Sequence, residues 1–413
     1  MNDRLGVVRD VALVSIGKYS QYVVTLVTLP LCARLLGPSG MGLLAVAMST
    51  YFLGALITDM GITTFLAARV SDADVNRLRA GYGALRGAAV LVFGTAALAA
   101  HLLDLSPMVQ MVTIGLFGGS LSAAGDDWVL LGLNRFGLLA LQQGAGRLVY
   151  LLTLIIFLPA VPTPHTAMVC LIVSSVVPVA WSWAWTFRNL GRPDKPEGAR
   201  QLLRLGGPVL LARLLENTYE QGAASLFSLA LAPRALGLFS AADRPVQAGG
   251  SLLDAIGYSL LPRMARRRNT ETDFWETTYR MIRAVAVLGV LAAIATTIAA
   301  PWVVSLLFGN EFRESVRLLQ IEAWALPGMA VASFLSTAVL PVLSDTRGVV
   351  LGSSIGAAVA VIALGITVVN RDPITVVCGI AAAESAAAIF YILRMRRMRH
   401  RGVAPLGLAT VSA

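Results

Sequence analysis

Long apolar stretches alternate with short polar segments along all 413 residues of the chain. A helix needs about 20 apolar residues to cross the hydrocarbon core of a bilayer, and twelve stretches reach that length. They lie at residues 11–33, 40–68, 84–103, 108–131, 137–158, 164–187, 206–230, 235–262, 284–307, 318–343, 348–369 and 373–393. The pattern predicts an all-α integral membrane protein with about twelve transmembrane helices. The even number puts both termini on one side of the membrane.

The composition excludes the soluble classes of protein. Hydrophobic residues make up 56% of the chain, charged residues make up only 14%, and the mean hydropathy is +0.73. Soluble domains carry about 25% charged residues. So few charges would not cover the surface of a soluble protein of this size. A cytosolic enzyme, an extracellular domain and a disordered chain are therefore all excluded.

Basic residues are distributed unevenly between the two sides that the span pattern predicts. Of the 33 lysines and arginines, 24 lie on the side of the termini, five lie on the opposite side and four lie inside spans. Because cytoplasmic loops carry an excess of Lys and Arg, we predict that both termini are cytoplasmic and that the protein lies in the cytoplasmic (inner) membrane. This count assigns Arg79 and Arg86 to the cytoplasmic connectors.

The basic runs have a simple interpretation. The cluster Arg266-Arg267-Arg268 and the tail at 394–401 are expected to face the anionic headgroups of membrane lipids. Binding of nucleic acid would require aromatic residues interleaved with the basic ones, and these runs lack them. No nucleic-acid partner is therefore expected.

The chain divides near its midpoint. The segment 188–198 is polar and rich in proline and glycine, which is typical of a linker. We predict an N-terminal six-helix lobe at 1–190, a cytoplasmic linker at 191–205 and a C-terminal six-helix lobe with a basic cytoplasmic tail at 206–413.

A shift of 195 residues aligns the two halves. It superposes a proline, a membrane aspartate, a membrane cation and a second membrane carboxylate: Pro38 and Pro233, Asp59 and Asp254, Lys18 and Arg213, and Asp127 and Glu322. Because each half contains an even number of spans, both halves insert in the same sense. This predicts a parallel pseudo-two-fold repeat, in which the substrate path lies between the lobes, as in secondary transporters.

Two predicted helices carry a polar stripe inside the membrane. Residues three, four and seven positions apart share one helix face. The first and seventh spans have polar residues at this spacing: Lys18, Gln21, Tyr22 and Thr25, and Arg213, Glu216, Asn217 and Glu220. Charges in a bilayer are costly unless they are paired or hydrated, so we expect the stripes to line a water-filled cavity. Alternatively, Lys18 and Arg213 snorkel to the cytoplasmic surface.

Four further charges lie within other predicted spans. Arg244 lies near the middle of the eighth span and Arg147 lies in the fifth, and each either faces the cavity or forms an internal ion pair. Asp59 and Asp254 lie at equivalent depths in the two halves. They are candidate sites for a proton or a cation, or they pair with cytoplasmic arginines.

Signatures of enzymatic chemistry are absent from the sequence. The three histidines define neither a metal site nor a catalytic triad, and there is no P-loop or nucleotide-binding motif. The external connectors are too short to hold a catalytic loop. We expect no enzymatic activity, no metal and no cofactor, apart from a coupling ion such as H+ or Na+.

Two stretches resemble the polysaccharide-transporter (O-antigen flippase) branch of the multidrug/oligosaccharidyl-lipid/polysaccharide exporter superfamily. The first is Ala33-Arg-Leu-Leu-Gly-Pro-Ser-Gly-Met-Gly-Leu-Leu-Ala, continuing to Thr58-Asp-Met-Gly-Ile. The second is Gly237-Leu-Phe-Ser-Ala-Ala-Asp-Arg, continuing to Leu261-Pro-Arg. In the second half, Ala232-Pro-Arg stands in place of the Leu-Gly-Pro of the first. The resemblance implies two six-helix lobes around a V-shaped cavity that opens alternately to the two sides.

The resemblance and the membrane charges together favour a lipid-linked glycan as the substrate. A polyprenyl-diphosphate glycan requires cations for its phosphates, a hydrated lumen for its sugars and a lateral opening for its lipid tail. We expect the diphosphate to bind Lys18, Arg213, Arg244 and Arg147. The residues expected to line the cavity or to carry the coupling ion are Gln21, Tyr22, Asp59, Glu216, Asn217, Glu220 and Asp254. Membrane lipids, a glycan polymerase and glycosyltransferases are the expected partners.

Two other functions fit the same architecture. A cation-coupled exporter of small drugs or metabolites would use carboxylates as its main site and would tolerate loss of the arginines. A non-transporting membrane scaffold for glycan assembly would not depend on any charge in the cavity.

Overall fold

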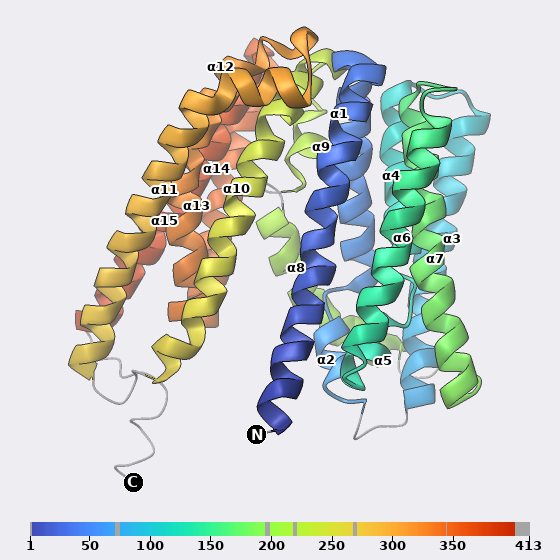
Figure 1. Ribbon diagram of the computed structural model, residues 1–413, viewed down its shortest axis with the longest axis horizontal. Coiled ribbons are helices and arrows are strands. Elements are labelled where there is room, and N and C mark those ends of the chain that lie inside the picture. The colour runs from blue at the N-terminus through green and yellow to red at the C-terminus, as the bar shows by residue number, and fades with distance from the viewer. Residues whose placement is uncertain are drawn as a thin grey trace. The chain divides into compact units, whose positions relative to one another are not determined.

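The computed structural model describes residues 2–70, 75–194, 199–217, 221–266, 271–343 and 345–400. Every regular element within these ranges is helical, and within each part of the chain the long helices run alongside one another (Figure 1). Nine helices of the described residues are long and apolar enough to cross a membrane. The predicted all-α membrane fold is confirmed, and the protein is a multi-pass membrane protein.

The chain forms two compact units, Met1–Leu214 and Leu215–Ala413, which we call the first and second units. The division lies inside helix α8 (Ala199–Asn217), a few residues beyond the linker that the sequence analysis placed at 191–205.

The first unit begins with a long, bent helix. Its elements are α1 (Asn2–Asp59), α2 (Thr63–Ala67), α3 (Val75–Leu102), α4 (Pro107–Ser122), α5 (Asp127–Gly132), α6 (Phe136–Phe157), α7 (Pro164–Leu190) and most of α8. Gly37 interrupts α1 with a φ of 63° and a ψ of −178°, and Pro38 follows it. Glycine tolerates a positive φ, and proline lacks an N–H and prevents a regular helical turn. The first two predicted spans are therefore the two arms of α1.

Glycine also allows α4 to pack closely on α1. A Cβ atom added at Gly119 would collide with the carbonyl oxygen of Tyr51, and one added at Gly115 would collide with Thr50. Small residues allow membrane helices to approach to backbone contact, where dispersion forces replace the hydrophobic effect as the main attraction. This packing fixes α4 and positions α5, which follows it.

The second unit contains the remaining helices. They are α9 (Ala223–Phe227), α10 (Pro233–Arg266), α11 (Glu271–Leu307), η2 (Asn310–Phe312), α12 (Ser315–Glu322), η3 (Ala323–Ala325), α13 (Leu326–Phe334), η4 (Leu335–Val339), α14 (Thr346–Asn370) and α15 (Pro373–His400). The tenth predicted span, 318–343, is thus divided into several helical segments, with a π-helical turn at η4.

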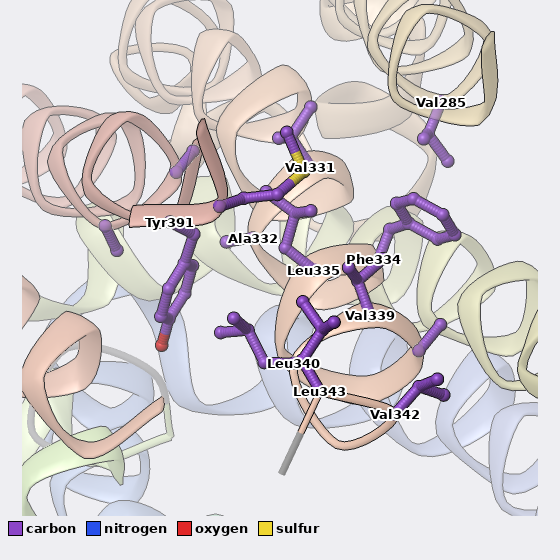
Figure 2. Close-up of a cluster of buried hydrophobic side chains, with 14 of the residues drawn as sticks. Val285, Val331, Ala332, Phe334, Leu335, Val339, Leu340, Val342, Leu343 and Tyr391 are labelled. Carbon is purple, nitrogen blue, oxygen red and sulfur yellow. The ribbon is translucent and has the colours of Figure 1, made fainter. Parts of the chain in front are cut away.

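A buried hydrophobic cluster fixes α11, α13, η4 and α15 against one another (Figure 2). Phe334, Leu335 and Val339 lie at its centre, and Tyr391 contributes from α15. The Tyr391 hydroxyl donates a hydrogen bond to the Val349 carbonyl oxygen at 3.0 Å, so its polar atom is satisfied within the apolar core.

An ion pair fixes the start of α14 to the end of α15. Asp345 caps α14 by accepting from the Gly348 N–H at 3.0 Å, and it also accepts from both Nε and Nη2 of Arg394, the latter at 2.7 Å. The hydrogen bonds from Arg394 hold the pKa of the Asp345 carboxyl below its ordinary value.

Candidate functional site

The first unit encloses a polar cavity of about 380 Å³. It lies at the end of the unit where α1 passes into α2 and α4 passes into α5. Its lining combines charged, amide and hydroxyl side chains with a few apolar ones: Asp59, Gly61, Thr63, Arg86, Ser122, Ala123, Gly125, Asp127, Trp128, Leu131, Leu139, Gln143 and Arg213. We call this space the first-unit cavity.

A sharp turn after α1 brings Asp59 and Arg213 to the same cavity. Met60 and Gly61 both have positive φ angles, of 52° and 66°, which end α1 and redirect the chain into α2. A Cβ atom added at Gly61 would lie 3.0 Å from Cγ1 of Val209 and 3.1 Å from Cδ of Arg213. Glycine at this turn therefore allows α8 to pack against it, with the exposed Arg213 on the lining.

Asp59 is held in one orientation by two hydroxyl donors. Its Oδ1 atom accepts from Thr63 and, at 2.9 Å, from the hydroxyl of Tyr82. The Tyr82 hydroxyl also lies 2.8 Å from the Asp59 carbonyl oxygen, where it can donate as well. The carboxyl group at the end of α1 is consequently half-buried and prepositioned, not free to rotate.

Arg86 occupies the inner wall of the cavity. It is only 2% exposed, and its guanidinium carbon lies 3.7 Å from the centroid of the Tyr82 ring. Its Nη1 atom donates to the carbonyl oxygens of Ala123, at 3.0 Å, and Gly125. These carbonyls are at and just beyond the C-terminus of α4, where backbone acceptors lack helical partners and cations are favoured. Arg86 Nε is buried without a hydrogen-bond partner among the described residues.

Asp127 faces the cavity from the first turn of α5. Its Oδ1 atom accepts from the Nε2 of Gln142 at 2.7 Å, and Gln143 lines the cavity beside it. The first-unit cavity therefore contains two guanidinium groups and two carboxyl groups. Arg86 is committed to backbone carbonyls, whereas Arg213 presents its exposed guanidinium to the space.

A buried ion pair supports this site from behind. Arg79 Nε donates to Oδ2 of Asp126 at 2.9 Å, and the two side chains are only 1% and 11% exposed. Arg79 also donates to Asn76, Thr186 and the Gly191 carbonyl oxygen at 2.9 to 3.0 Å. The hydroxyl of Thr186 donates to the same Asp126 oxygen at 3.0 Å. The network joins α3 and α7 to the turn before α5 and uses all three guanidinium nitrogens of Arg79, so its role is structural.

These positions correct one prediction from the sequence. Arg79 and Arg86 were counted with the cytoplasmic connectors, but both are buried inside the first unit, at 3% and 2% exposure. Arg79 lies within the helix because α3 begins at Val75, well before the predicted span at 84–103. Arg86, near the start of that span, faces the neighbouring elements as Arg79 does. Their spacing with Asn76 and Tyr82, three or four residues at each step, is a signal that they share one helix face.

The other predicted site residues are distributed over both units. Arg147 is half-buried on α6 and does not line the first-unit cavity. Arg244 lies in the second unit, where its Nε donates to the Ser240 hydroxyl at 3.2 Å, and Asn217 also belongs to that unit. The predictions for Glu220 and for the side chains of Lys18, Gln21, Tyr22, Glu216 and Asp254 fall outside the described residues.

The second unit contains a buried pair of carboxyl groups. The Ser315 hydroxyl donates to the Leu238 carbonyl oxygen at 2.8 Å and so fixes α12 against α10. A few residues further along, the carboxyl group of Asp243 on α10 lies next to that of Glu322 on α12. Glu322 is 0% exposed, and neither of its oxygens accepts a hydrogen bond from a described donor.

The two carboxylates that the 195-residue shift superposes, Asp127 and Glu322, lie at different positions along their candidate spans. Asp127 follows α4 near the end of the candidate span Pro107–Gly132, whereas Glu322 lies near the start of Ser315–Val339. No group of three or more His, Cys, Asp or Glu side chains within the described ranges could hold a metal ion.

Comparisons with known proteins agree with this architecture. The family model described as polysaccharide biosynthesis protein matches residues 7–267. A search of curated proteins gives no significant match.

Several solved structures share the fold. The lipid II flippase MurJ in an inward-closed conformation is 11% identical, with a TM-score of 0.77 over 93% of this chain and 87% of that chain. A MOP-superfamily transporter from Pyrococcus furiosus is 16% identical, with a TM-score of 0.60 over 94% of each chain. A mutant of the Vibrio cholerae MATE transporter VcmN is 15% identical, with a TM-score of 0.59 over 94% of this chain and 96% of that chain.

At these identities the structural matches show the fold of a MOP-superfamily transporter and do not by themselves assign a substrate. The family model, in contrast, covers more than half of the sequence, including α1, α3 and the turns that build the first-unit cavity. The chain belongs to the polysaccharide biosynthesis protein family.

Proposed function

We propose that the protein flips a lipid-linked oligosaccharide, carried on polyprenyl diphosphate, from the cytoplasmic to the outer leaflet of the inner membrane by alternating access. Family membership and the fold of MOP-superfamily transporters support a transport role and not an enzymatic one. The product would serve the biosynthesis of a cell-surface polysaccharide. Glycosyltransferases would supply the substrate, and a glycan polymerase would consume it.

The observation that carries this proposal is the exposed guanidinium of Arg213 at the first-unit cavity. A diphosphate needs strong donors, and a guanidinium can bind phosphate oxygens in a bidentate manner. Arg86 is less accessible to a phosphate, because it is only 2% exposed and its Nη1 is bonded to the carbonyls of Ala123 and Gly125. Arg86 instead contributes fixed positive charge behind the site.

The other cavity groups suit the sugar and the coupling ion. Thr63 and Gln143 offer a hydroxyl and an amide, which are the usual partners of sugar hydroxyls. Asp59 and Asp127 are candidates to bind H+ or Na+ or to compete with the diphosphate for Arg213. Lys18, Arg147 and Arg244 remain proposed diphosphate contacts at other stages of transport. The proposed orientation has both termini in the cytoplasm.

Replacement of Arg213 tests the proposal directly. The variant is expressed in a strain that lacks the chromosomal gene. Arg213→Ala is expected to reduce glycan display at least tenfold, because the loss of a hydrogen bond to a charged group accounts for about that factor. The lipid-linked intermediate should then accumulate in the cytoplasmic leaflet. Arg213→Lys should retain partial display, because it keeps the charge without the bidentate geometry.

Arg204→Ala is the matched control, because Arg204 is an exposed arginine on the same helix that does not line the cavity. Display by this control should equal that of the wild type at equal protein level. Undiminished display with Arg213→Ala would contradict the proposal.

The competing function is cation-coupled export of small drugs or metabolites. The likeness to MATE transporters and the prepositioned Asp59 carboxyl favour it. In that case Asp59→Asn would abolish transport while Arg213→Ala would be tolerated. Reconstituted vesicles that contain a fluorescent polyprenyl diphosphate would separate the two functions.

A further inference from the structure

The second unit has a larger polar cavity that the transport proposal does not use. It has a volume of about 1220 Å³ and lies between the first turns of α11 and the last turns of α15. Its lining is rich in arginine: Trp275, Glu276, Tyr279, Arg280, Arg283, Arg396 and Arg399. We call it the arginine cavity.

The charge of the arginine cavity is strongly positive. Four guanidinium groups face a single carboxylate, Glu276, which forms an exposed ion pair with Arg280 at 2.8 Å. The Arg399 guanidinium carbon lies 5.2 Å from the centroid of the Tyr279 ring, a cation–π contact that orients this side chain. A cluster of like charges of this kind is unfavourable by itself and is stabilised by an anion.

The base of the cavity supplies a further donor. Trp275 is 3% exposed and belongs to the buried hydrophobic cluster of α11, α13, η4 and α15 (Figure 2). Its indole N–H is buried with no acceptor among the described residues. A buried donor without an acceptor is costly, and here it accompanies four exposed guanidinium groups that can also donate to a ligand. Both observations indicate a ligand that brings oxygen atoms and negative charge.

The position of the cavity indicates where these oxygens come from. The apolar candidate span Phe274–Leu307 begins at this cavity, and the candidate span Pro373–His400 ends at it. The donors thus lie where two membrane helices leave the hydrocarbon region, at the level of lipid phosphates. Basic pockets between membrane helices at this level are suited to anionic headgroups.

We propose that the arginine cavity binds the phosphate groups of an anionic phospholipid. The guanidinium groups of Arg283 and Arg396 contact the phosphate oxygens from the two helices, and the acyl chains lie along the apolar surfaces of α11 and α15. Binding therefore joins α11 to α15 and stabilises the second unit. This inference does not depend on which substrate the protein transports.

Lipid-dependent stabilisation of the full-length protein tests this proposal. The purified protein in a neutral detergent is titrated with phosphatidylglycerol, with phosphatidylcholine or with inorganic phosphate, and the midpoint of thermal unfolding is recorded. We expect phosphatidylglycerol to raise the midpoint saturably and the other two additives to have little effect. The double variant Arg283→Gln with Arg396→Gln should raise the half-saturating lipid concentration about tenfold.

The matched control removes two arginines from the segment after α11, Arg313→Gln with Arg317→Gln, both of which are exposed and outside the cavity. It should respond to phosphatidylglycerol as the wild type does. The variant Arg283→Lys with Arg396→Lys keeps the charge, so it should retain most of the response and shows that loss is not a folding defect.

Three results would overturn the proposal. The first is an unchanged lipid response in the double glutamine variant. The second is an equal loss in the control, which would make the effect a general one of net charge. The third is stabilisation by inorganic phosphate equal to that by phosphatidylglycerol, which would identify a site for free phosphate and not for lipid.

Discussion

Buried charged groups have different kinds of partners in the two units. In the first unit, Arg79 and Asp126 are almost fully buried, and all three guanidinium nitrogens of Arg79 donate hydrogen bonds to described acceptors. In the second unit, Glu322 is equally buried, yet its hydrogen-bond partner among the described residues is another carboxyl group, that of Asp243. A satisfied network supports a fold, whereas a pair of buried carboxyl groups inside a membrane is a candidate functional site.

The contrast extends to the two cavities. The first-unit cavity balances two cations against two carboxylates, and its residues are oriented by short hydrogen bonds. The arginine cavity has four cations and one carboxylate, and its donors are incompletely paired. A balanced, prepositioned site suits a ligand that binds and leaves, because its groups need not reorganise. A site with an excess of cations, such as the arginine cavity, suits an anion that stays bound.

The largest expected effect comes from breaking the satisfied network. Asp126→Ala leaves the Arg79 guanidinium buried without its carboxylate, and removal of one partner of a buried pair costs about 3–5 kcal/mol. We expect a large drop in the thermal unfolding midpoint of the purified protein. The double variant Arg79→Met with Asp126→Leu should recover part of the loss, because it removes both charges together.

Asp194→Ala is the control for this experiment, because Asp194 is exposed and its backbone N–H, not its side chain, bonds to the Asn76 carbonyl oxygen. It should unfold at the wild-type temperature. A small effect of Asp126→Ala, comparable to that of the control, would mean that the network is not a structural support.

A smaller effect of opposite sign is expected in the second unit. Glu322→Gln keeps the shape of the side chain and adds an amide N–H that can donate to Asp243. Since a hydrogen bond contributes about 1 kcal/mol, the unfolding free energy should rise by about that amount. The same variant should impair transport if the acidic pair binds a coupling ion. If Glu322→Gln destabilised the protein instead, the acidic pair would be a structural support like the network of the first unit, and the contrast between the two units would be wrong.

The smallest effect concerns the ion pair of Asp345 and Arg394, which is partly accessible to solvent. Because folding lowers the pKa of Asp345, its contribution to stability is present above the ordinary value of 3.8 and is lost as the pH falls through the folded value. Asp345→Asn should therefore destabilise the protein by about 1 kcal/mol at neutral pH. In a series of unfolding measurements, the difference from the wild type should shrink as the pH falls below 3.8 and should disappear below the folded pKa of Asp345.

A difference between Asp345→Asn and the wild type that persists unchanged at low pH would show that the ion pair is not its source. Loss of the cap on α14 would not explain such a difference, because Asn can also cap a helix.

Local sequence patterns determined the helices and the bend in α1. Apolar runs of sufficient length identify the membrane-crossing elements, because an unpaired backbone is too costly in lipid. Gly37 and Pro38 mark the bend in α1 by their own backbone preferences. The polar stripe also identified Arg213 as a cavity residue candidate, and the structure places it on the lining of the first-unit cavity.

Only the tertiary structure decided which charges are buried and which partners they have. Arg79 meets Asp126 and Thr186, which lie 47 and 107 residues away in the chain, so no local pattern reports the pairing. Arg86 and Arg213 both line the first-unit cavity, yet one is buried and bonded to backbone carbonyls and the other is exposed. The burial of a charge depends on donors and acceptors that other helices bring to it, and the packing of those helices is a property of the whole unit.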